Sequence, residues 1–196
     1  MHNLDMKNYL YHGIVDWLYC NSHKSRDSFC LEKFDSILKH GFIYRPCDFK
    51  NNNISHTDFA NMYTYYFTFV GCHPDSIYAK KFTKNIKDDN GYTVATKYSK
   101  FGFLLNPKLL KELTIAEEAF CDKEILISDN ISIRKYGIGI YINPIELNEY
   151  SYQVITKLIK KYNYDFDIIN QYDGTIINSL QKEKEKCKKL NYTTSY

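Results

Sequence analysis

The sequence lacks the short motifs that mark several common enzyme classes. It has no Gly-x-Gly-x-x-Gly fingerprint, no P-loop, no Gly-x-Ser-x-Gly elbow and no His-Glu-x-x-His pair. These absences argue against a doubly wound nucleotide-binding fold, a serine nucleophile and a zinc protease. Nothing in the sequence places two carboxylates together as a glycosidase would need.

Cysteine is present but is not grouped. Six cysteines are scattered between Cys20 and Cys187 with no Cys-x-x-Cys pair. A disulfide framework is unexpected in a chain of this length, and no Cys/His spacing fits a zinc finger. We therefore predict reduced thiols and no metal cofactor. Reduced thiols favour a cytoplasmic location, or delivery into another cytoplasm by a separate export machine.

Long apolar runs and a strong charge of one sign are also missing. No run of about 18 apolar residues predicts a transmembrane helix, and no signal peptide is visible at the N-terminus. The net charge is +3, which is small for a dedicated nucleic-acid binder. The basic run Lys182–Lys189 also contains two Glu and is typical of a solvated helix face or tail. We expect no membrane partner.

What is present suffices for one folded domain. The 196 residues are 44% hydrophobic and 16% aromatic, which permits a buried core. Apolar periodicity and turn residues predict an α+β fold of short strands with helices early and late. The expected strands are 8–15, 63–70, 101–106, 123–128 and 136–142; the expected helices are 29–40, one starting at 73–75 and running through Phe82, 107–113, 150–162 and about 175–190.

Three segments each carry one chemically capable residue on or beside a short apolar strand. His12 precedes Gly13, where another backbone or a ligand can approach closely. Tyr66 lies in an aromatic strand, and Tyr78 lies one turn into the helix that follows. For His12 and for both tyrosines, ordinary packing in the core remains the alternative interpretation.

Glu124 is the candidate carboxylate. Strand alternation puts Glu124 and Leu126 on one face and Ile125 and Ile127 on the other. A carboxylate at the start of an apolar strand is either an edge residue or a functional group. Two preceding residues, Glu117 and Glu118, remain open as substitutes for it.

These segments together resemble the ADP-ribosyltransferase fold, in its His–Tyr–Glu branch of diphtheria-toxin-like and PARP-like enzymes. Tyr11-His12-Gly13, with the helix ending at Ile37–Ile43, resembles the first block of that family. The segment Tyr65–Phe69 with Ser76–Ala79 is similar to the second block, and Glu124–Ile131 is similar to the third. The resemblance covers roughly residues 9–142. The family that it indicates includes bacterial and phage toxins and effectors.

The resemblance implies the following roles. His12 would contact the adenosine ribose of NAD, and the Gly13 backbone would bind the nicotinamide amide. Tyr66 and Tyr78 would enclose the nicotinamide ring. Glu124 would hold the nicotinamide-ribose hydroxyl and stabilise positive charge on the anomeric carbon. Catalysis would thus rest on His12, Tyr78 and Glu124.

The resemblance also implies an organisation and an activity. Residues 1–144 would form a catalytic domain of split antiparallel sheets with flanking helices, and residues 145–196 a C-terminal helical extension packed on it. The expected function is mono-ADP-ribosyl transfer from NAD, without a metal, to a macromolecule; near-neutral charge favours a protein acceptor over nucleic acid. A catalytically inactive nucleotide- or partner-binding module, an NAD glycohydrolase and, last, an RNA 2′-phosphotransferase are the alternatives.

Overall fold

A computed structural model describes six stretches of the chain, which are residues 3–14, 26–44, 68–73, 75–78, 99–115 and 124–192. Their elements in chain order are η1 (Met6–Asn8), β1 (Leu10–Gly13), α1 (Arg26–His40), β2 (Phe42–Ile43), β3 (Thr68–Cys72), β4 (Phe101–Leu105), α5 (Leu109–Glu112), β5 (Glu124–Ile127), β6 (Ile131–Ser132), α6 (Ile133–Tyr136), β7 (Gly137–Ile142), α7 (Glu149–Lys161), β8 (Asp167–Asn170) and α8 (Leu180–Lys189).

A mixed sheet organises the described residues. Six strands lie in the order β5-β3-β1-β4-β7-β8, and a separate pair is formed by β2 and β6. Every neighbouring pair in the larger sheet is antiparallel except β7 and β8, which are parallel. The fold is therefore α+β with flanking helices, as the sequence predicts.

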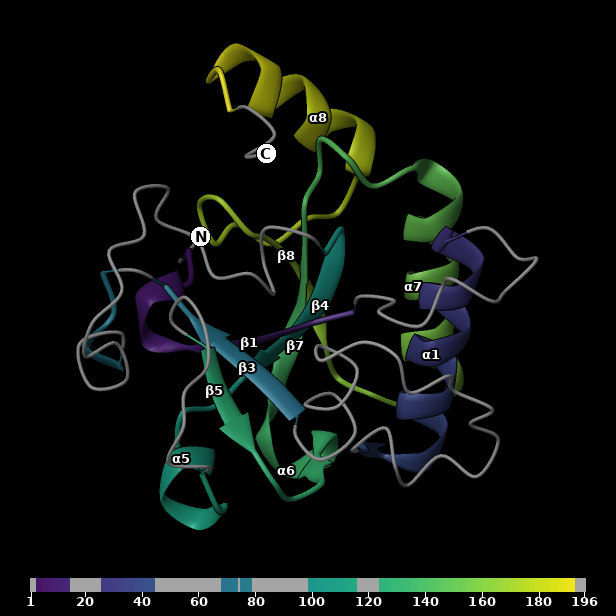
Figure 1. Cartoon of the computed structure of the whole chain (residues 1–196). Coiled ribbons are helices and arrows are strands. Elements are labelled where there is room, and N and C mark those ends of the chain that lie inside the picture. The colour runs from purple at the N-terminus through teal and green to yellow at the C-terminus, as the bar shows by residue number, and fades with distance from the viewer. Residues whose placement is uncertain are drawn as a thin grey trace, which may run out of the picture.

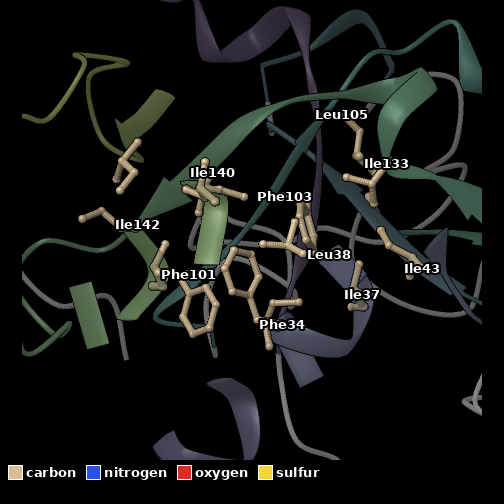
Figure 2. Close-up of a cluster of buried hydrophobic side chains, with 14 of the residues drawn as sticks. Phe34, Ile37, Leu38, Ile43, Phe101, Phe103, Leu105, Ile133, Ile140 and Ile142 are labelled. Atoms are coloured by element: carbon tan, nitrogen blue, oxygen red, sulfur yellow. The ribbon is translucent and has the colours of Figure 1, made fainter. Parts of the chain in front are cut away.

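Helices α1 and α7 lie side by side along one face of this sheet (Figure 1). Strand alternation sends Phe101 and Phe103 of β4 to this face, where both rings lie 5.4 Å from the ring of Phe34 in α1. Ile37 and Leu38 of α1 extend the same buried cluster (Figure 2). This layer is the main core, and it fixes β4 and β7 against the helices.

The opposite face of the sheet carries a smaller apolar cluster. Tyr11 of β1 and Tyr141 of β7 meet edge to face at 5.4 Å, and Met6 packs beside them. The Tyr11 hydroxyl donates to the carbonyl of Met6, so the N-terminal turn η1 is held against this face.

The C-terminal region corrects two expectations. Residues 145–196 are not only helical, because they supply β8, which pairs in parallel with β7 and completes the sheet. The helix expected from about 175 begins instead at Leu180, where the Ser179 side chain accepts from the N–H of Lys182. A parallel strand pair depends on contacts between distant segments, so the short run Ile168–Ile169 gave no clear local signal.

Several other elements appear where they were expected but are shorter. Strand β1 covers four of the seven described residues of the expected strand 8–15, and α5 covers four of the seven of 107–113. The predicted strand 136–142 is preceded by the one-turn helix α6, which the sequence did not indicate. No helix within the described residues is both long enough and apolar enough to cross a membrane.

Candidate functional site

His12 lies in the middle of the sheet, on β1. It is opposite Phe103 of β4, and its side chain is 8% exposed. Alternation places it with Leu10 on the face that carries the main core. Burial beside apolar neighbours fits either a packed histidine or one that holds a ligand, as the sequence left open.

Gly13 is directly opposite Gly102 of β4. A Cβ atom on Gly102 would lie 2.2 Å from the carbonyl oxygen of His12 and 2.8 Å from the Cα of Gly13. The glycine at 102 therefore sets how closely the two strands approach at this point.

Strands β1 and β3 separate beside His12. Their pairing ends at Tyr11 and Gly71, whereas β1 stays paired with β4 through Gly13. Strand β3 meanwhile stays paired with β5 back to Thr68. Figure 1 shows β1 and β3 diverging from this point. Gly13 thus lies beyond the end of the pairing with β3.

Glu124 is the first residue of β5, which lies at one edge of the sheet, and it pairs with Gly71. Through Gly71 it is level with Tyr11 rather than with His12. Alternation assigns positions 124, 71 and 11 to one face of the sheet and position 12 to the other. The register therefore brings these two residues to strands two apart, but not to a common face.

Of the two tyrosines, only Tyr78 can be placed; Tyr66, like Glu117 and Glu118, lies outside the described residues. Tyr78 is half-buried and packs against the main core. Its N–H donates to the Ser76 hydroxyl at 3.1 Å, which is the bond expected of a residue that starts a helix. Ser76 thus caps the start of the helix that the sequence predicts here.

One residue of this region escaped the sequence interpretation. Thr68 of β3 is 3% exposed, and its Oγ1 makes no hydrogen bond. The available signal was a hydroxyl residue within an otherwise aromatic and apolar strand. Within the described residues no group of three His, Cys, Asp or Glu side chains is arranged to hold a metal ion.

A second polar cluster lies at α8, away from these strands. It consists of Asn170, Asp173, Thr175, Glu183 and Lys186, and we call it the α8 cluster. Lys186 Nζ lies 2.7 Å from Asp173 Oδ2 and 2.8 Å from Glu183 Oε1, and buried Asn170 donates to the same Glu183 oxygen at 2.6 Å. These contacts fasten α8 to the end of β8.

The contact between Asp173 and Lys186 shifts the pKa of both side chains. Burial raises the pKa of Asp173, but hydrogen bonds from Lys186 and Thr175 outweigh it, so that the pKa lies below its ordinary value. Burial lowers the pKa of Lys186, but the bonds to Asp173 and Glu183 outweigh it and raise the pKa above its ordinary value. The α8 cluster therefore serves to attach α8 to the end of β8.

No family model matches the sequence, and no curated protein matches it. Function is therefore argued from the residues above.

Proposed function

We propose that this chain is a mono-ADP-ribosyltransferase that cleaves NAD and transfers ADP-ribose to a macromolecular acceptor, with protein favoured over nucleic acid. The observation that carries the proposal is topological. The three segments that resemble the family overlap β1, β3 and β5, which are far apart in sequence but consecutive in the sheet.

The end of the β1–β3 pairing is the second support. In the proposed roles the backbone of Gly13 binds the nicotinamide amide, which requires backbone groups outside the strand ladder. Gly13 lies beyond the pairing with β3, and glycine permits close approach. His12 immediately before it is suited to position a ribose by hydrogen bonding.

The chemistry follows from these roles. The bond between the anomeric carbon and the nicotinamide nitrogen breaks, and its electron pair leaves with nicotinamide. The Glu124 carboxylate stabilises the positive charge that develops on the sugar, while Tyr66 and Tyr78 hold the departing ring. The acceptor nucleophile then bonds to the anomeric carbon and loses its proton.

The experiment is incubation of the protein with labelled NAD and a cell lysate, followed by protease or nuclease. Wild type is compared with Glu124→Gln, and Glu185→Gln on the exposed surface of α8 is the matched control. We expect label on a protease-sensitive acceptor with wild type and the control, and a loss of at least 100-fold with Glu124→Gln. Retained labelling in that variant would transfer the role to Glu117 or Glu118, whose Gln variants are run in parallel.

One observation favours a second candidate, a nucleotide-binding module without turnover. The register assigns positions 12 and 124 to different faces of the sheet, which is unexpected for two groups that share one substrate. Such a module would bind ADP-ribose without releasing nicotinamide, and Glu124→Gln would leave binding unchanged. Nicotinamide release without any labelled acceptor would instead identify an NAD glycohydrolase.

A further inference from the structure

The hydroxyl of Thr68 has no structural explanation in the described residues. Thr68 pairs with Ile127 of β5, and Val70 lies two residues further along the same face. Both of these neighbours are fully buried. The Thr68 side chain is 3% exposed, and Oγ1 has no hydrogen-bond partner.

Packing alone would favour valine at this position. Valine has nearly the same shape as threonine, is equally suited to a strand and carries no polar atom. A buried hydroxyl without a partner costs roughly 1–3 kcal/mol. The hydroxyl is therefore a cost to the folded chain that a bound group would remove.

The position of Thr68 in the sheet indicates which bound group would supply the missing hydrogen bond. Alternation places positions 68, 70 and 12 on the same face, on the two strands that separate at the end of the β1–β3 pairing. In this stretch β3 is paired with β5 on one side and no longer with β1 on the other. Thr68 and His12 thus flank the divergence from opposite strands.

We propose that the Thr68 hydroxyl is a substrate-binding group that hydrogen-bonds a polar group of NAD, either the nicotinamide carboxamide or a ribose hydroxyl. This inference rests on the proposed function and adds a residue to its site. A hydroxyl both donates and accepts, so it matches either group of NAD. Because Thr68 is covered in the ligand-free chain, side chains over this face move aside when NAD binds.

The test compares Thr68→Val with Thr68→Ser, which keeps the hydroxyl, and with Thr156→Val as a remote control. Thr156 lies on α7, where its hydroxyl bonds to the carbonyl of Tyr152. For each variant we measure the dissociation constants of NAD, nicotinamide and ADP-ribose, the KM and kcat of the transfer, and the melting temperature. Thr68→Ala replaces Thr68→Val if the latter does not fold.

Thr68→Val is expected to weaken NAD binding and raise KM about tenfold while its melting temperature stays equal or rises. Thr68→Ser should restore binding to within about twofold, and Thr156→Val should not change it. A loss confined to nicotinamide identifies the carboxamide as the partner, and a loss confined to ADP-ribose identifies a ribose.

Two results contradict the inference, and they differ from each other. If wild type binds and cleaves NAD and Thr68→Val does so equally well, the hydroxyl is not a binding group and the proposed function stands. If wild type neither binds nor cleaves NAD, the proposed function fails and this inference fails with it.

Discussion

Gly102 allows the central strands β1 and β4 to lie close together because it has no side chain. A side chain there would meet the His12 carbonyl oxygen at 2.2 Å and the Tyr141 hydroxyl oxygen at 2.7 Å. The first contact is backbone and cannot rotate away, whereas the second is the end of a side chain. The sequence drew attention to Gly13, but the need for glycine at 102 appears only when β1 and β4 are paired.

Gly102→Ala should therefore destabilise the fold by roughly 1–3 kcal/mol through overpacking, measured by chemical denaturation. Adding Tyr141→Phe removes only the side-chain contact and should not restore stability, because the backbone contact remains. Gln181→Ala on exposed α8 should change stability by less than about 0.5 kcal/mol. Recovery in the double variant would show that strand spacing is not the cause.

Helices and strands differ in how far the sequence predicted them. Helix α7 was expected at 150–162 and is found at Glu149–Lys161, because its apolar stripe and the cap at Asn148 are local. Strand β8 was not expected, because its pairing with β7 joins segments that no short-range pattern connects. The strands that bear His12 and Glu124 were recognisable because their apolar pattern is local. Their register decides which faces the two residues share, and it was not recognisable because it depends on pairing between distant segments.

The attachment of α8 is the second case in which distant residues decide an element. Lys186→Met should remove the cation from Asp173 and Glu183 and cost roughly 1–2 kcal/mol, since the pair is only partly buried. Amide exchange of α8 should then accelerate more than that of α7. Lys188→Met, on the exposed side of the same helix, is the control and should leave exchange unchanged.

The same cluster predicts a pH window. The lowered pKa of Asp173 gives stability that is present above its unfolded value of about 3.9 and is lost as pH falls through the folded value. The raised pKa of Lys186 gives stability that is present below about 10.4 and is lost as pH rises through the folded value. In the wild type, the amides of α8 should be protected from exchange at pH 7 and should lose that protection below pH 4. In Lys186→Met, the protection of α8 should not change in this way between the two pH values.

At the scale of the whole molecule, the C-terminal region is part of the structure that positions the candidate site. Helix α7 packs against α1, and β8 covers the edge of β7 that would otherwise be open. Helix α1 in turn covers β4, which is paired with the strand of His12. The sequence correctly predicted one α+β fold, but a boundary at 144 divides a single sheet.

A chain that stops at residue 144 should therefore fail to fold. It would expose the α1 surface that contacts α7 and leave β7 as an unpaired edge, which invites aggregation. A chain that stops at residue 178 keeps α7 and β8 and loses only α8, so it should fold with lower stability. Circular dichroism and denaturation separate the two, and the intact chain should unfold in one cooperative transition. A stable, cooperatively folded 1–144 fragment would show instead that β8 and α7 are appended to a sheet that does not need them, and the integrity of the site would then rest on β1, β3, β4 and β5 alone.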